Sequence, residues 1–169
     1  VLRTDRKAAQ KILSTYLNLL TVYPDQPYDQ PEVVHPINGM PIVTPKNCGD
    51  FSRLFPKEER VLELVRQKAA NGERVLIYTS WTRTDSQKKL QKLLCSEGYR
   101  TEILTPQIAT DKREDWVNKR VKGGLQVLIT NPRCVETGLD LNAFTTIIFY
   151  SMGYNLFTPV SYTHLRAHE

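Results

Sequence analysis

The sequence predicts an α/β fold from about residue 51 onward, a parallel sheet with helices on both faces, preceded by a helix and a proline-rich irregular segment. Short apolar runs alternate with helical segments of about ten to fifteen residues, the order typical of parallel strands joined by right-handed crossovers. The runs are continuously apolar, as in strands covered on both faces. With 169 residues, 40% of them hydrophobic, the chain can bury one sizeable core.

The N-terminal 50 residues predict a helix and then a proline-rich connection. An amphipathic helix is expected over residues 5–20, because apolar side chains recur there at helical spacing: Ala9, Ile12, Leu13, Tyr16, Leu17 and Leu20. Pro24 ends this pattern. Six of the ten prolines lie between Pro24 and Pro45, which indicates an irregular segment.

The first helix and strand of the α/β region follow directly. Pro56 suits a first helical position, acidic Glu58 and Glu59 suit the first turn, and Gly72 suits the end. The run from Val75 to Tyr78 predicts a buried strand.

The remaining elements continue the alternation. Thr84-Asp85-Ser86-Gln87 resembles a capping box and opens a helix that ends at Gly98. A strand is expected at Ile103–Leu104, and a helix over 111–122 that Gly123-Gly124 ends. Further strands are expected at 127–129 and 147–150.

Polar side chains follow two of these strands, at the sheet edge where ligands of parallel sheets bind. Thr79-Ser80-Trp81 follows the first strand and precedes a helix N-terminus, a combination suited to phosphate. Thr130-Asn131 follows the third strand. Further on, Gly138 would allow close backbone approach, and Asp140 offers an acceptor for a sugar hydroxyl.

Each of these features also has a purely structural interpretation. Thr79 and Ser80 would then cap a helix, Trp81 would pack in the core, and Gly138 and Asp140 would be turn residues. Basic residues on two helices are expected to form solvated faces. They are Lys88, Lys89, Lys92, Lys112, Arg113, Lys119, Arg120 and Lys122.

The ordered set of motifs resembles the C-terminal, second RecA-like lobe of superfamily-two helicases, a P-loop NTPase-type fold. Residues 75–81 resemble helicase motif IV, and residues 127–132 leading into 137–141 resemble motif V. Residues 147–150 with Tyr154-Asn155 resemble the segment before motif VI in Swi/Snf-type DNA-dependent ATPases. The resemblance covers 51–159. The loop from Thr130 to Gly138 is longer than in DEAD-box members and lacks the double glycine common in Swi/Snf members.

The resemblance implies roles for eight residues. Six would contact the nucleic-acid backbone: Thr79, Ser80, Trp81, Thr130, Asn131 and Thr137. Gly138 and Asp140 would bind nucleotide, with Asp140 near the ribose of ATP. The implied partners are DNA or RNA and an N-terminal ATPase lobe of the same chain, and the implied cofactors are ATP and Mg²⁺ in the intact protein.

Several catalytic elements of that group are absent from the sequence. It contains no G-x-x-x-x-G-K-[ST] and no Asp-Glu dipeptide, so no P-loop lysine or acidic magnesium motif is present. We therefore expect the chain alone to be an incomplete lobe that binds no ATP or Mg²⁺, holds no catalytic residue and hydrolyses no ATP.

Residues 160–169 are predicted to be foreign to the protein. Val-Ser-Tyr-Thr-His-Leu-Arg-Ala-His-Glu is the translation of GTC-TCT-TAT-ACA-CAT-CTC-CGA-GCC-CAC-GAG, which resembles the end of a transposase-based sequencing adaptor. The expected organisation is thus a helix and inter-lobe connection over 1–50, a lobe over 51–159, and this tail.

Charge and cysteine usage agree with an intracellular nucleic-acid-binding protein. The formal net charge is +5, compatible with a polyanionic partner. The three cysteines are widely spaced and form no C-x-x-C, so neither zinc nor a disulfide framework is expected. No stretch approaches the roughly eighteen apolar residues of a membrane span, so we expect a cytoplasmic protein without membrane contact.

Two other functions fit the same α/β pattern. One is the nucleotide-sugar-binding lobe of a two-lobed glycosyltransferase, in which Glu136 or Asp140 would hold the ribose. The other is a non-catalytic module, either for nucleic-acid binding or for protein interaction.

Overall fold

The computed structural model describes residues 2–80, 85–135 and 139–151. The chain divides into two compact units, residues 1–57 and 58–169, which are treated separately below. No helix in the described ranges is both long and apolar enough to cross a membrane.

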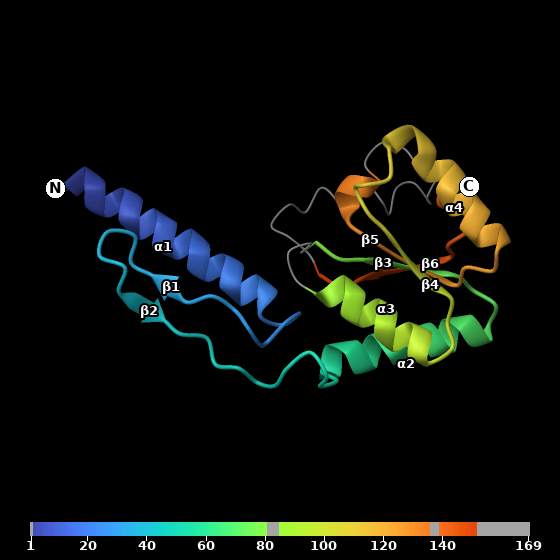
Figure 1. Cartoon of the computed structure of the whole chain (residues 1–169), viewed down its shortest axis with the longest axis horizontal. Helices are drawn as coiled ribbons and strands as arrows, with labels where there is room; N and C mark the ends of the chain where they lie inside the picture. Colours follow the sequence, from blue (N-terminus) through green and yellow to red (C-terminus); the bar gives the residue numbers. More distant parts are fainter. Residues whose placement is uncertain (1, 81–84, 136–138, 152–169) are drawn as a thin grey trace. The chain divides into compact units, whose positions relative to one another are not determined.

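The first unit consists of a long helix and a small hairpin (Figure 1). Helix α1 spans Leu2–Val22, close to the predicted range, and Pro24 follows it. The proline-rich segment contains an antiparallel pair, β1 (Val33–Val34) and β2 (Pro41–Val43). We did not predict this hairpin, since strands of two and three residues are too short for a detectable alternation of apolar and polar residues.

Contacts between distant residues hold this proline-rich segment together. Lys57 forms an ion pair with Asp25, whose side chain is buried. The rings of Tyr28 and Phe55 stack with centroids 6.0 Å apart. The segment is therefore folded back on itself despite its few regular hydrogen bonds.

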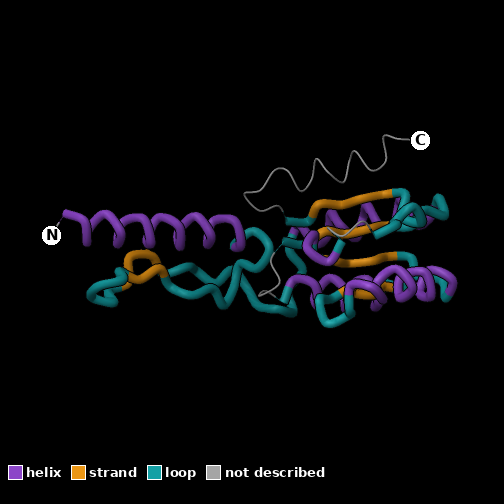
Figure 2. Tube along the Cα trace, turned by 90° about the horizontal axis from the view of Figure 1, so that it is seen from above, coloured by secondary structure: helices purple, strands orange, loops and turns teal. Residues whose placement is uncertain are grey.

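The second unit is built on a four-stranded parallel sheet, which confirms the predicted fold class. Its strands are β3 (Val75–Tyr78), β4 (Thr101–Leu104), β5 (Val127–Thr130) and β6 (Thr146–Phe149). They lie side by side in the order β4-β5-β3-β6. Figure 2 draws the strands in orange and the helices in purple. Val75 is in register with Val127 on one side and with Thr146 on the other.

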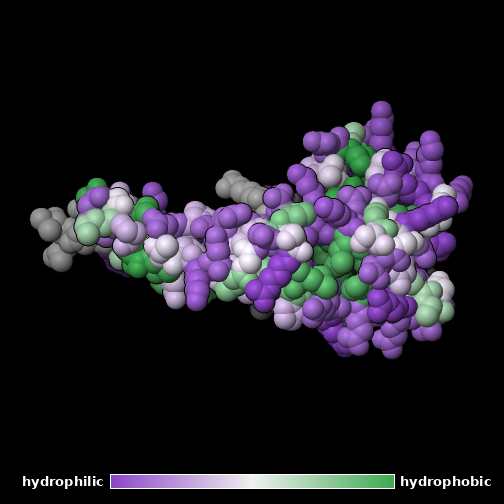
Figure 3. All heavy atoms as spheres, turned by 60° about the horizontal axis from the view of Figure 1, so that its bottom comes forward, coloured by the Kyte–Doolittle hydropathy of each residue, from purple (hydrophilic) through white to green (hydrophobic). Residues whose placement is uncertain are grey.

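Helices cover both faces of this sheet (Figure 1). Helices α2 (Pro56–Ala70) and α3 (Ser86–Ser96) pack on one face, and α4 (Arg113–Lys122), which follows the 3₁₀ turn η1 (Thr110–Lys112), packs on the other. Val75 and Ile77 point into the core beside α2 and α3, whereas Leu76 and Tyr78 point into the core beside α4. Hydrophilic side chains project over much of the visible surface of this unit (Figure 3).

Glycine residues follow the ends of helices α2 and α3, as the sequence predicted. Helix α2 begins at Pro56, and Gly72 follows its end with φ +75°. Gly98 follows α3 with φ +88°. Both glycines adopt the left-handed conformation that other residues disfavour, so they end the helices as predicted.

One sequence interpretation for α3 needs correction. The helix begins at Ser86 with Asp85 as N-cap, and Gln87 Nε2 donates to Thr79 Oγ1 at 2.6 Å. The predicted capping box depends on Thr84, which lies outside the described residues. Lys89 is not solvated as expected: it forms a 2.9 Å ion pair with Glu58 of α2, with side-chain exposures of 9% and 2%.

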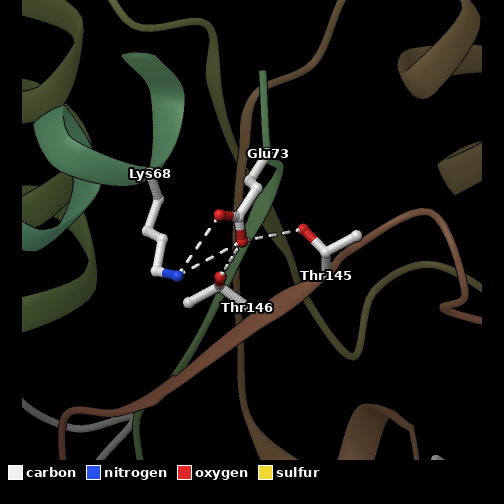
Figure 4. Close-up of polar contacts among 4 residues, drawn as sticks. All are labelled: Lys68, Glu73, Thr145 and Thr146. Atoms are coloured by element: carbon white, nitrogen blue, oxygen red, sulfur yellow. Dashed lines mark hydrogen bonds and ion pairs between the residues drawn. The ribbon is translucent and has the colours of Figure 1, made fainter. Parts of the chain in front are cut away.

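A polar cluster joins α2, β3 and β6 at the amino end of the sheet (Figure 4). The carboxylate of Glu73 accepts hydrogen bonds from Thr146 Oγ1 at 2.8 Å and from Thr145 Oγ1 at 3.3 Å. Lys68 Nζ lies 3.2 Å from Glu73 Oε1. The Thr146 hydroxyl, followed by the Lys68 ammonium group, lowers the pKa of the Glu73 carboxyl below its ordinary value.

This cluster predicts a pH-dependent contribution to stability. Because the pKa of Glu73 is lower in the folded state, its contribution is complete above the ordinary glutamate pKa and is lost as pH falls through the folded-state value. The melting temperature of the wild type should therefore exceed that of Glu73→Gln near pH 6, and the difference should shrink toward about pH 3. The matched control is Glu63→Gln, at a side chain that is 65% exposed. An unchanged difference between wild type and Glu73→Gln across this range would contradict the assignment.

Candidate functional site

Four of the five predicted site residues that the structure describes meet at the carboxyl edge of the sheet. Strands β5, β3 and β6 are neighbours and end at Thr130, Tyr78 and Phe149. Thr79 and Ser80 follow β3, and Asn131 follows β5. The structure therefore brings Thr79, Ser80, Thr130 and Asn131 together, although about 50 residues of sequence separate the two pairs.

Asn131 connects the ends of β3 and β5. Its Nδ2 donates to the carbonyl oxygens of Thr79 and Ser80 at 3.2 and 3.1 Å. Its Oδ1 accepts from the backbone N–H of Arg133 at 2.9 Å. The residue is 7% exposed, so its amide is used within the fold.

Ser151 connects β6 to the same edge. Its Oγ accepts from Ser80 N at 2.7 Å, and its carbonyl oxygen accepts from Ser80 Oγ at 2.9 Å. Asn131, Ser80 and Ser151 thus link three neighbouring strand ends, and we call them the strand-end clasp. We did not predict Ser151, although its position immediately after a predicted strand was a usable signal.

The two threonines of the site are buried. Thr79 is 1% exposed and its hydroxyl accepts from Gln87, while Thr130 is 0% exposed and its hydroxyl donates to Leu104 O at 3.3 Å. Ser80 is half-buried. Among the described predicted contact residues, Ser80 is therefore the most accessible to a ligand.

Asp140 is exposed and forms a turn. Its Oδ1 accepts from Asn142 N at 3.0 Å, which agrees with the structural interpretation of this residue. Its second carboxylate oxygen makes no hydrogen bond within the described ranges and can accept one from a ligand hydroxyl. The other predicted site residues, Trp81, Thr137 and Gly138, lie outside the described residues.

The described residues contain no group of three or more His, Cys, Asp or Glu side chains placed to hold a metal ion. The carboxyl edge offers hydroxyls and backbone groups, and the exposed Asp140 carboxylate lies in the turn before β6. These groups suit an oxygen-rich ligand bound by hydrogen bonds.

Comparison with known proteins gives one family. A sequence model described as "Helicase conserved C-terminal domain" matches residues 56–167, about two thirds of the chain, including part of the predicted foreign tail. No curated protein matches.

Two solved structures share the fold. The C-terminal part of the Fun30 ATPase domain is 18% identical with a TM-score of 0.58, and the match covers 67% of this chain and 36% of that one. The Hef helicase domain of Pyrococcus furiosus is 16% identical with a TM-score of 0.52, and the match covers 67% and 23%. The chain therefore spans well under two thirds of either structure.

Proposed function

Since the chain belongs to the helicase conserved C-terminal domain family, we propose that it acts as the second lobe of a superfamily-two, ATP-dependent helicase or translocase and grips the phosphate backbone of DNA. Family membership favours this function over the glycosyltransferase lobe. The intact motor would pair this lobe with a first ATPase lobe, and the cleft between lobes would close over ATP and reopen after hydrolysis.

The strand-end clasp is the observation that carries the proposal. It aligns the ends of β5, β3 and β6 through side-chain and backbone hydrogen bonds of 2.7–3.2 Å. The donors of the clasp are used within the fold, so its part in the proposal is to hold three neighbouring strand ends at fixed positions. Fixed positions matter because phosphate contacts orient the polymer without identifying its bases. Binding should therefore be independent of sequence and weaken with salt.

The described residues offer a binding group for only one part of the implied ATP–Mg²⁺, the ribose. Asp140 has a carboxylate oxygen suited to a ribose hydroxyl. The described residues hold no ligand set for Mg²⁺. This chain would therefore supply one edge of the nucleotide site, through Asp140.

Fluorescence anisotropy with a labelled oligo(dT) tests the proposal. We expect binding at low salt, with a plot of log affinity against log salt concentration that is linear and has a slope of about −0.7 per phosphate contacted. Ser80→Ala removes the hydrogen bond from Ser80 Oγ to Ser151 O that holds the ends of β3 and β6 together, and it should weaken binding about fivefold, the size of one lost hydrogen bond. The matched control is Ser96→Ala, because the Ser96 hydroxyl also donates to a backbone carbonyl, at 2.7 Å, but lies at the end of α3. Absence of binding by the wild type at low salt would refute the proposal.

A further inference from the structure

In the described part of the loop after β5, the 3₁₀ turn η2 spans Pro132–Cys134. The side chain of Asn131 holds the start of this turn by accepting from Arg133 N. Within the turn, Cys134 N donates to Asn131 O at 2.9 Å and Val135 N donates to Pro132 O at 3.0 Å. Cys134 is 1% exposed and packs in the core beside α4.

The other end of η2 is held from α4. Arg113, the first residue of that helix, is 8% exposed, which corrects its assignment to a solvated basic face. Its Nη1 donates to Cys134 O at 3.0 Å, and its Nε donates to Ile108 O at 3.0 Å. The guanidinium group therefore joins the loop before α4 to the last residue of η2.

The chemistry of these contacts indicates what the side chain does. Both acceptors are backbone carbonyls in segments that are 26 residues apart in sequence. A planar guanidinium can donate to two acceptors in fixed directions, whereas a lysine ammonium on a flexible stem holds such a pair less well. Arg113 thus constrains the path of the backbone.

We propose that Arg113 is a positioning residue of the candidate site, which together with Asn131 clamps η2 at both ends. This clamp sets the place and direction in which the chain leaves the sheet edge at Val135 and continues toward Asp140. The expected effect on ligand binding rests on the proposed function, whereas the clamp itself is a property of the fold.

Hydrogen exchange tests the clamp without any ligand. In Arg113→Met, the amides of Cys134 and Val135 should exchange about tenfold faster, the size expected for loss of a charge-assisted hydrogen bond. The amides of β5 and α4 should keep their protection. In Arg113→Lys, the exchange rates at residues 134–135 should lie between those of the wild type and those of Arg113→Met. Lys112→Met, at the exposed neighbouring residue, should exchange at the wild-type rate. Unchanged exchange at residues 134–135, or an equal increase throughout the second unit, would overturn the proposal.

Oligo(dT) binding separates positioning from direct contact. Arg113→Met should weaken the affinity about five- to tenfold while the slope of log affinity against log salt stays constant, because no phosphate contact is lost. A slope reduced in magnitude by about 0.7 would show that Arg113 contacts phosphate and would overturn the positioning role. If the wild type fails to bind, the proposed function is refuted, and the exchange measurement still decides on the clamp.

Discussion

Replacing Lys89 with methionine should destabilise the second unit by about 3–5 kcal/mol. The ammonium group lies 2.9 Å from Glu58 Oε1, and both side chains are more than nine-tenths buried. The substitution would remove the Lys89 ammonium group from beside the buried Glu58 carboxylate, and removing one member of a buried ion pair is far more costly than removing one member of an exposed pair. Urea unfolding followed by tryptophan fluorescence measures the effect, because both tryptophans of the chain lie in this unit.

The neighbouring lysine supplies the control. Lys88 lies 3.8 Å from Asp85, with side-chain exposures of 79% and 58%. Lys88→Met should therefore change the free energy of unfolding by less than about 0.5 kcal/mol. The double variant Lys89→Met with Glu58→Leu should recover most of the lost stability, since apolar replacement of a buried pair is often neutral. Equal effects at Lys88 and Lys89 would contradict the buried-pair argument.

The second large effect is expected at Phe144. This side chain is 2% exposed and packs with Cys134 and Val135 in the core beside α4. Phe144→Ala should cost about 3–5 kcal/mol, because the lost apolar burial is accompanied by a cavity. The same unfolding measurement applies.

A conservative substitution would identify the cause. Phe144→Leu keeps most of the buried apolar volume, so its cost should be below about 1.5 kcal/mol. The backbone N–H of Phe144 donates to Leu141 O at 2.9 Å, a bond that neither substitution removes. A cost for Phe144→Ala below that for Phe144→Leu would contradict the packing argument.

The bounds of the strands were predictable from the sequence where both faces of a strand are fully buried. Val75–Tyr78 and Val127–Thr130 are apolar almost throughout because both of their faces are covered, and they were predicted to within one residue. Strand β4 begins at Thr101, two residues before the prediction, because it lies at the edge of the sheet and includes the half-buried polar Glu102. The strand order depends on pairings between distant segments, which periodicity does not encode.

The position of the candidate site was predictable from the sequence, but the hydrogen bonds within it were not. Parallel strands end at a common edge, so Ser80 and Asn131 were expected to be neighbours. That Asn131 donates to Ser80 O, and that Gln87 turns toward Thr79, depends on loop geometry. Lys89 and Arg113 were misjudged because the groups that compensate their burial, Glu58 and two carbonyls, are supplied by other segments.

The strand order also affects how the chain folds while it is being synthesised on the ribosome. Strand β3 is the first of the four to be made, yet both of its neighbours, β5 and β6, come from the C-terminal part of the chain. A nascent chain that has extended through α3 and β4 therefore exposes the apolar strand Val75–Tyr78 with neither edge paired. We expect this intermediate to be prone to aggregation and to require chaperones until residues 146–149 have emerged.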